Sequence, residues 1–444
     1  MTPLDFLRWY EHDERSFRGH YYPTAPLGVE EGDRVGVVLM NLGGPDALED
    51  VEAFLYSLLM DPALLDLPVD GTLRHGACRA LAAFYAESVQ QEYELIGGGS
   101  PLTRLTHEQA QSLGQYLTEH FGDPTGIEFG TYVAMRHGHP SSEEAAAQMV
   151  EDDVDKVVLL PLYPQYSVAT SGSSLAYWRA LDERDEMPSW PTTAQLEYAA
   201  NPKYVQALSE RIDEGLQRFP KGQRTEVELL FSAHSPPLRT ARRDRDPYCC
   251  LVHSTVQRVM QYRDHDRPVH TGFQNRIGLR KGLTPSTPTA LQRLARDGVN
   301  SVLVVPLTFA TDHLLTSYGL DINARQEAEA AGITHFEVTS PLNTHPLFIE
   351  ALGEATISQL SLPVDVNQLR VGGDGLAQDY PLRSFGERPR FDEGAPAARC
   401  SVCDAPTPAR RWVASDDVPD SDVIQAGEGT GVRDRPAPSS ESNA

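Results

Sequence analysis

The chain has 444 residues and a formal net charge of −25, with 63 acidic against 38 basic side chains. Hydrophobic residues make up 40% of it and charged residues 23%, which is the balance of a folded globular protein. The acidic charge, and the lack of Lys and Arg clusters with interleaved aromatic residues, argue against a nucleic-acid partner.

Targeting and redox features point to the cytoplasm. No apolar run reaches the roughly 18 residues that cross a bilayer, and residues 1–33 contain no apolar core of a signal peptide. Five cysteines in a chain of this length do not make a disulfide framework. A cytoplasmic location in a reducing compartment is therefore expected.

One pattern recurs along the chain: a short β-branched run, a turn rich in Gly, Pro or Ser, and then a helical stretch. The runs are 34–41, followed by a helix from about Ala47, then 156–162, 227–232 and 301–307. Strands that alternate with helices form parallel sheets with crossover helices. The sequence thus predicts an α/β fold of two doubly wound, Rossmann-like lobes, at 34–200 and 201–360, with a cleft between them.

The C-terminal part differs in composition. Residues 352–360 are expected to form the last helix, and 361–412 form an extension that contains Cys400 and Cys403. Residues 413–444 are rich in Asp, Ser, Gly and Pro and hold few apolar side chains. Such a segment cannot bury enough surface to offset its ordering entropy, so a disordered acidic tail is expected there.

Polar and aromatic side chains gather where the predicted strands end, which is where open parallel sheets bind ligands. They are Asn41, Gly43, Gly44, Arg136, His137, His139, Tyr163, Tyr166, His234, Asp312 and His313. Each has a plain structural reading as well: a histidine in a turn, an aspartate as a helix cap, glycines in a tight turn. The apolar segment 54–67 is core by default, with an exposed lip as the alternative. The residues alone leave the reaction open.

Several of these segments stand in one order that is specific to a family. They include Asn41-Leu-Gly-Gly-Pro-Asp46, Gly97-Gly-Gly-Ser-Pro101, Tyr163-Pro-Gln-Tyr166, Phe231-Ser-Ala-His234 and Thr311-Asp-His313. Together, from about residue 34 to 355, they resemble the ferrochelatases. The resemblance implies insertion of ferrous iron into a porphyrin, protoporphyrin or coproporphyrin, in haem biosynthesis and without an organic cofactor.

The resemblance also assigns roles to residues. Two pyrrole nitrogens lose protons as the metal enters, so the site needs a general base, and neutral imidazole suits that role. His234 matches the family's histidine and is expected to be the pyrrole base and a metal ligand. Asp312 and His313 are expected to be catalytic as well. The residues that match the porphyrin cleft are Met40, Arg136, Tyr163, Tyr166 and Phe309.

The same resemblance extends to partners. The segment 54–67 would form a lip over the apolar edge of the macrocycle and contact a membrane peripherally. A monomer or a homodimer is expected, with porphyrin and ferrous iron as partners.

The chain also departs from the family. Leu315 stands where the family carries a glutamate, and Gly319 replaces a second one, whereas Asp321 matches. Because leucine cannot accept a proton, either Asp312, His313 or Asp321 relays protons, or activity is weak. A porphyrin- or haem-binding homologue without activity, and a chelatase for another metal such as cobalt, stay open as alternatives.

Some relatives hold a [2Fe–2S] cluster on four cysteines. Cys400 and Cys403 match two of these ligands, but the other two positions fall on Pro408 and Val168. No cluster is therefore expected. A remnant of such a site, or a zinc or disulfide site between molecules, would also account for the pair.

Overall fold

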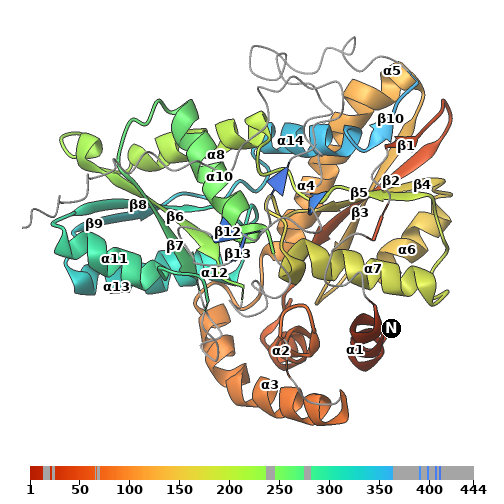
Figure 1. Ribbon diagram of the computed structural model, residues 1–444, viewed down its shortest axis with the longest axis horizontal. Coiled ribbons are helices and arrows are strands. Elements are labelled where there is room, and N and C mark those ends of the chain that lie inside the picture. Colours follow the sequence, from red (N-terminus) through yellow and green to blue (C-terminus); the bar gives the residue numbers. More distant parts are fainter. Residues whose placement is uncertain are drawn as a thin grey trace, which may run out of the picture.

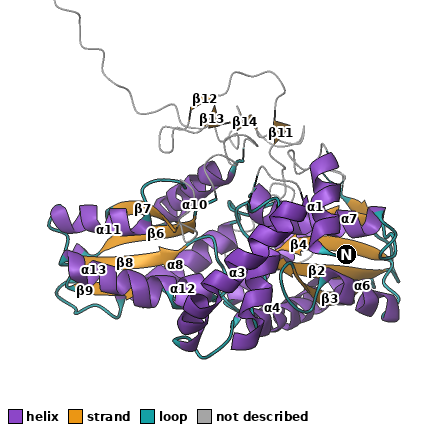
Figure 2. Cartoon of the chain, turned by 90° about the horizontal axis from the view of Figure 1, so that it is seen from below, coloured by secondary structure: helices purple, strands orange, loops and turns teal. Residues whose placement is uncertain are grey.

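The computed structural model describes residues 1–13, 21–22, 26–65, 67, 71–236, 246–274 and 282–363, and four two-residue strands between 390 and 411. Two four-stranded sheets lie side by side, with helices on both faces of each (Figures 1 and 2). Their strand orders are β3-β2-β4-β5 and β7-β6-β8-β9, and every neighbouring pair is parallel. The predicted doubly wound α/β fold is confirmed.

The first sheet consists of β2 (Arg34–Asn41), β3 (Glu128–Met135), β4 (Lys156–Pro161) and β5 (Thr192–Ala194). The second consists of β6 (Glu228–His234), β7 (Val269–Gln274), β8 (Ser301–Pro306) and β9 (His335–Val338). Short strands pair outside these sheets: β1 (Leu27–Gly28) with β10 (Leu360–Ser361), β11 (Arg390–Phe391) with β14 (Arg410–Arg411), and β12 (Ala398–Arg399) with β13 (Pro406–Thr407).

The α-helices up to the first sheet's last strand are α1 (Pro3–His12), α2 (Val51–Met60), α3 (Gly71–Glu94), α4 (Leu102–Leu117), α5 (Asp123–Thr125), α6 (Ser142–Glu151) and α7 (Ser173–Glu183). Those that follow are α8 (Pro202–Leu216), α10 (Tyr248–Tyr262), α11 (Thr287–Arg296), α12 (Leu314–Ser317), α13 (Arg325–Ala331) and α14 (Pro346–Ile357). Short 3-10 or π turns are η2 (Leu48–Asp50), η3 (Thr118–Gly122), η4 (Val168–Gly172), η5 (Arg224–Glu226) and η6 (Gly319–Ala324).

Apolar side chains of the strands point alternately to the two faces of each sheet, and helices cover both faces. In β2, Val37 and Leu39 join a core shared with α4, whereas Val38 and Met40 join a second core with α6 and α7. Successive side chains of a strand point to opposite faces, so a strand that is buried on both sides reads as one apolar run. The run 34–41 was recognisable in the sequence for this reason.

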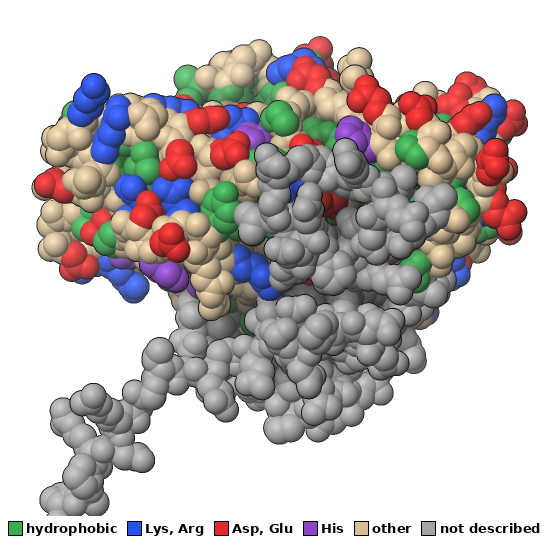
Figure 3. Space-filling view, turned by 90° about the horizontal axis from the view of Figure 1, so that it is seen from above, with side chains coloured by type: hydrophobic (Ala, Val, Ile, Leu, Met, Phe, Trp, Pro, Cys, Tyr) green, Lys and Arg blue, Asp and Glu red, His purple; other side chains and the backbone are tan. Residues whose placement is uncertain are grey.

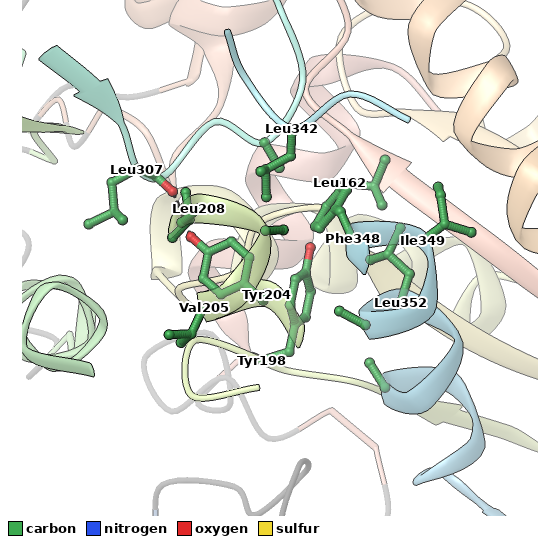
Figure 4. Packing of buried hydrophobic residues seen from close by; sticks show 14 of the residues in the cluster. Leu162, Tyr198, Tyr204, Val205, Leu208, Leu307, Leu342, Phe348, Ile349 and Leu352 are labelled. Atoms are coloured by element: carbon green, nitrogen blue, oxygen red, sulfur yellow. Dashed lines mark hydrogen bonds between the residues drawn. The ribbon is translucent and has the colours of Figure 1, made fainter. Parts of the chain in front are cut away.

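One core joins the two sheets. It contains side chains of β2 and β4 together with those of β6 and β8, and it includes Tyr198, Tyr204 and Phe348 (Figure 4). The hydroxyl of Tyr204 donates a hydrogen bond of 2.8 Å to the carbonyl of Leu307, so α8 is tied to the end of β8. Each predicted lobe contains one sheet; the boundaries at 34–200 and 201–360 stay predictions.

Three helices, α1, α2 and α3, lie together below the two sheets in the view of Figure 1. Helix α1 begins with Thr2 as its N-cap and Pro3 in its first turn, a common start of a helix. Arg74 of α3 is buried and donates hydrogen bonds to the carbonyls of four residues, Leu59, Met60, Asp61 and Leu65. It thereby fixes the corner between α2 and α3.

Two features concern the surface. Over the described part of the chain, no helix is both long and apolar enough to cross a membrane. Figure 3 shows acidic side chains crowded over the end of the molecule that holds the first sheet, whereas basic and acidic side chains mix at the other end.

Some details differ from expectation. His234 is the last residue of β6 rather than the first after it, and the helix expected at 352–360 is α14, which begins at Pro346. The stretch from about Ala47 opens with a 3-10 turn before α2. Cys400, Cys403, most of the predicted extension 361–412 and the whole predicted tail 413–444 lie outside the described residues, as do Pro237 and 275–281.

Candidate functional site

A small pocket lies where β2, β4 and β8 end. It is lined by Asn41, Leu42, Leu102, Leu162, Tyr163, Phe309, Ala310, Thr311 and His313. The cavity measures about 10 Å³, which is room for one water molecule. Segments far apart in the sequence meet here because the carboxyl ends of parallel strands share one edge of a sheet.

Beside this pocket, two histidines flank one phenylalanine ring. The ring of Phe309 lies 3.9 Å from that of His313 and 5.8 Å from that of His234, measured between centroids. The backbone N–H of His234 donates to the hydroxyl of Thr308 at 3.0 Å, which fixes the end of β6. Within the described residues, Nδ1 of His234 is buried and makes no hydrogen bond. Burial lowers the pKa of His234 to about 4, so its imidazole is neutral at pH 7.

Asp312 is held by its neighbours. Its carboxylate accepts hydrogen bonds from Thr316 at 2.9 Å, Asn343 at 3.0 Å and Ser317 at 3.4 Å. Its backbone N–H donates to the side chain of Asn343 at 2.9 Å, and Asn343 has a left-handed φ of 46°. These contacts tie Asp312 to the side chains of α12 and Asn343 and so fix the loop carrying His313, which is itself the N-cap of α12.

A second polar cluster lies in the first lobe, around the carboxylate of Asp61. Arg136 forms an ion pair with Asp61 at 2.9 Å, and Nε2 of His137 lies 3.4 Å from the same oxygen. Ser173 donates to Asp61, and Arg136 donates to Ser173 at 2.9 Å. Nδ1 of His137 lies 2.9 Å from the hydroxyl of Ser57 on α2. The side chains of Asp61 and His137 are fully buried and that of Arg136 is 8% exposed.

The charges of this cluster explain its protonation. Burial by itself would raise the pKa of Asp61, but the charge of Arg136, the His137 ring and the Ser173 hydroxyl outweigh it and hold that pKa well below its ordinary value. Burial and the charge of Arg136 lower the pKa of His137, against the opposing effect of Asp61. At pH 7 the cluster therefore contains one carboxylate, one guanidinium and a neutral imidazole.

Comparison with known proteins assigns the family. The family model described as Ferrochelatase matches residues 34–360. The chain is 39% identical to the ferrochelatase of Cyanothece sp. over 331 residues, which is 74% of this chain and 84% of that protein. It is 38% identical to the ferrochelatases of Nostoc sp. and Trichodesmium erythraeum, again over 74% of this chain, and over 83% and 84% of theirs. The chain belongs to the ferrochelatase family.

As a ferrochelatase, the chain is a metal chelatase that inserts ferrous iron into a porphyrin in haem biosynthesis. Porphyrin and ferrous iron are its substrates. The described residues contain no group of three or more His, Cys, Asp or Glu side chains that could together hold a metal ion. Among solved structures, it is similar to SirB from Bacillus subtilis, with 11% identity, a TM-score of 0.43, and coverage of 74% of this chain and 96% of that one.

The structure places the five expected cleft residues of the ferrochelatase in different surroundings. Tyr163 and Phe309 line the pocket. Met40 and Tyr166 lie in the core between the first sheet and α7, exposed by 1% and 4%. Arg136 faces Asp61 rather than solvent. The fold thus brings Tyr163 and Phe309 together with His313 and His234. Met40 and Tyr166 do not line the pocket and lie in the adjacent core.

The positions where this ferrochelatase departs from its family lie on and after α12. Leu315 is partly exposed, and a Cβ added at Gly319 would lie 4.0 Å from the Cβ of Leu315 and 3.3 Å from Oε1 of Gln274. Asp321 pairs with Arg325 at 2.6 Å on an exposed face. Asp321 is therefore engaged in a surface ion pair.

Sequence reasoning missed Asp61. It stands inside the apolar stretch 54–67, which was read as core or lip, and its partner Arg136 is far away in the chain. The lone aspartate within this apolar run could have indicated a buried ion pair, because a buried carboxylate needs a partner.

Proposed function

We propose that this ferrochelatase uses His234 as the base that removes pyrrole protons and as the ligand that receives the iron. The observation that carries the proposal is the half-buried imidazole of His234, whose buried Nδ1 makes no hydrogen bond within the described residues. Its low pKa keeps the ring neutral at pH 7, so a lone pair is available for a proton or for Fe(II). Asp312 acts by holding the loop of His313, and His313 passes the proton on.

The porphyrin, protoporphyrin or coproporphyrin, is proposed to bind against Tyr163 and Phe309. This pocket of about 10 Å³ is far smaller than ligand sites of that class, which measure several hundred Å³, so the macrocycle has to extend beyond the pocket. Binding energy from the porphyrin's periphery can then be used to bend the ring, which exposes its nitrogen lone pairs to the metal.

The lack of a carboxylate at Leu315 limits the proton route, in this proposal, to His234 and His313. The protein is proposed to be cytoplasmic, a monomer or homodimer, with peripheral membrane contact through the lip at residues 54–67. It needs no organic cofactor and holds no [2Fe–2S] cluster.

The test is anaerobic insertion of Fe(II) into protoporphyrin and coproporphyrin, followed by absorbance. His234→Ala is expected to lower kcat at least roughly 100-fold, the lower end of what a positioned base contributes, and to retain porphyrin binding. His270→Ala is the matched control, because His270 lies in the same sheet but is 38% exposed and paired with Glu228 at 2.6 Å. It should keep normal turnover.

Three outcomes would contradict the proposal. Turnover that survives in His234→Ala would assign the base to another residue. Porphyrin binding without turnover in the wild type would favour a binding homologue, and a preference for Co(II) over Fe(II) and Zn(II) in competition would favour a cobalt chelatase.

A further inference from the structure

Helix α1 lies between two hydrophobic cores that are otherwise separate. Phe6 packs into the core that α7 and the first sheet share. Leu7, the next residue, packs into the core between α2 and α3, against Leu59 and Cys78. Both side chains are 1% exposed. The helices α2 and α3, which contain or flank the predicted lip 54–67, are called the α2–α3 lip from here on. Helix α1 therefore joins this α2–α3 lip to the body of the first lobe, as its place beside α2 and below α7 in Figure 1 indicates.

The ring of Phe6 also holds Arg136. The guanidinium carbon of Arg136 lies 4.5 Å from the centroid of Phe6 and 4.3 Å from that of Tyr177 on α7. These two rings meet edge to face at 5.3 Å. Cation–π contacts of this kind strengthen when the cation is shielded from water, as Arg136 is. The rings orient the guanidinium so that its edge faces Asp61 and Ser173.

The backbone of Arg136 and His137 is hydrogen-bonded to two residues that line the pocket. The backbone N–H of Arg136 donates to the carbonyl of Asn41 at 2.8 Å, and that of His137 donates to Leu42 at 2.8 Å. Asn41 and Leu42 both line the pocket. A cation held by Phe6 thus fixes the backbone from which the pocket wall is built.

The lip reaches the other lobe as well. Val51 of α2 and Tyr93 of α3 pack against Leu314, the residue that follows His313. The lip is therefore held at two points: by α1 on the first lobe and by α12 beside the histidines. A change at either attachment therefore reaches residues that line the pocket or adjoin it.

We propose that α1 is a clasp that holds the α2–α3 lip, and that Phe6 is a positioning residue which keeps Arg136 on Asp61 and so sets the affinity for porphyrin. Helix α1 precedes residues 34–360, the range that matches the family model. The inference deepens the proposed function and rests on its placement of the porphyrin. A loosened wall has to be ordered again on binding, which weakens affinity, whereas the chemistry at His234 is untouched.

The experiment compares Phe6→Leu, which keeps apolar volume but loses the aromatic face, with Tyr132→Leu. Tyr132 of β3 is the matched control because it is another buried aromatic residue of the same core, and its ring is not among those that contact Phe6 or Arg136. In Phe6→Leu, KM for porphyrin is expected to rise roughly three- to tenfold while kcat stays within twofold. Tyr132→Leu should leave both KM and kcat unchanged.

A second measurement needs no porphyrin. Hydrogen exchange of the α2 amides, Val51–Met60, is expected to speed up in Phe6→Leu and not in Tyr132→Leu. Equal effects of both variants, or unchanged exchange and KM in a folded Phe6→Leu protein, would overturn the clasp. Absent turnover in the wild type would overturn the proposed function instead, while the exchange result would still decide on the clasp.

Discussion

The two lobes each bury a polar group next to the pocket, and they treat it in opposite ways. In the first lobe, Asp61 has an arginine, a serine and a histidine around one carboxylate oxygen. In the second lobe, Nδ1 of His234 makes no hydrogen bond within the described residues, and the ring of Phe309 lies beside the imidazole.

The different surroundings of Asp61 and His234 favour a structural role for the first and a chemical role for the second. Two buried charges are retained in a protein when each compensates the other and further hydrogen bonds complete their environment. A neutral imidazole whose buried nitrogen makes no hydrogen bond costs stability, and such groups are common where a proton or a metal is received. This contrast supports the proposal that the Asp61 cluster stabilises the first lobe and that His234 is the reactive group of the second.

The largest effect is expected from breaking the charge pair. Arg136→Met leaves Asp61 buried without its cation, which costs about 3–5 kcal/mol in the free energy of unfolding. Urea denaturation measures this loss. Arg179→Ala is the control, since Arg179 pairs with Asp182 and Glu183 on the outer face of α7 with 30% exposure, and a pair of that kind contributes at most about 1 kcal/mol.

The double variant Asp61→Asn with Arg136→Met tests the cause. It should recover part of the stability lost in Arg136→Met, because no buried charge is then left alone. A double variant as unstable as Arg136→Met would mean that packing of the arginine side chain, rather than its charge, stabilises the lobe.

An added carboxylate tests the second lobe. Leu315 lies on α12, two residues after His313, and is partly exposed. If proton removal through His234 and His313 limits the reaction, Leu315→Glu is expected to raise kcat by up to roughly 100-fold, since a carboxylate can take up the proton. Leu315→Gln is the control, because glutamine has nearly the same shape as glutamate but no carboxylate that could take up a proton. Equal turnover of the two variants would show that proton uptake at this position does not limit the reaction.

The sequence predicted the strands of this fold better than its polar clusters. The runs at 34–41 and 301–307 are recognisable because strands buried on both faces are continuously apolar. His234 and Tyr163 could be singled out because they stand at strand ends. Met40 and Tyr166 belong to the same motifs and pack into the core of the first lobe, so their expected place in the porphyrin cleft stays a prediction.

The cluster of the first lobe was beyond sequence reasoning for a physical reason. Phe6, Asp61, Arg136 and Tyr177 come from four separate segments, and the rings of Phe6 and Tyr177 meet around Arg136 only once α1 lies on α7. Thr2 and Pro3 signal a helix start, so α1 itself could have been predicted from the opening residues. What that helix covers could not, because it depends on packing between distant segments.

The smallest expected effect is a difference in pH dependence, and it separates the two lobes. The pKa of Asp61 is held low, so its contribution to stability is present at neutral pH and is lost only as pH falls below the ordinary carboxyl range, about 4. The pKa of His234 is lowered to about 4, so the unfolded chain takes up a proton near pH 6.5 while the folded chain does not. Stability from a neutral His234 is therefore lost as pH falls from about 6.5 toward 4.

Urea denaturation at pH 7 and pH 5.5 gives the loss in the free energy of unfolding over this interval. The contribution of His234 is the difference between the loss in the wild type and the loss in His234→Gln. The wild type should lose about 1 kcal/mol more than the variant over this interval, because only the wild type has an imidazole that the unfolded state protonates first. His137, whose pKa is also lowered, is present in both proteins and cancels. Equal losses would mean that His234 is protonated in the folded protein at pH 5.5, and an imidazole that readily charges could not be the buried, unpaired base that distinguishes the second lobe from the first.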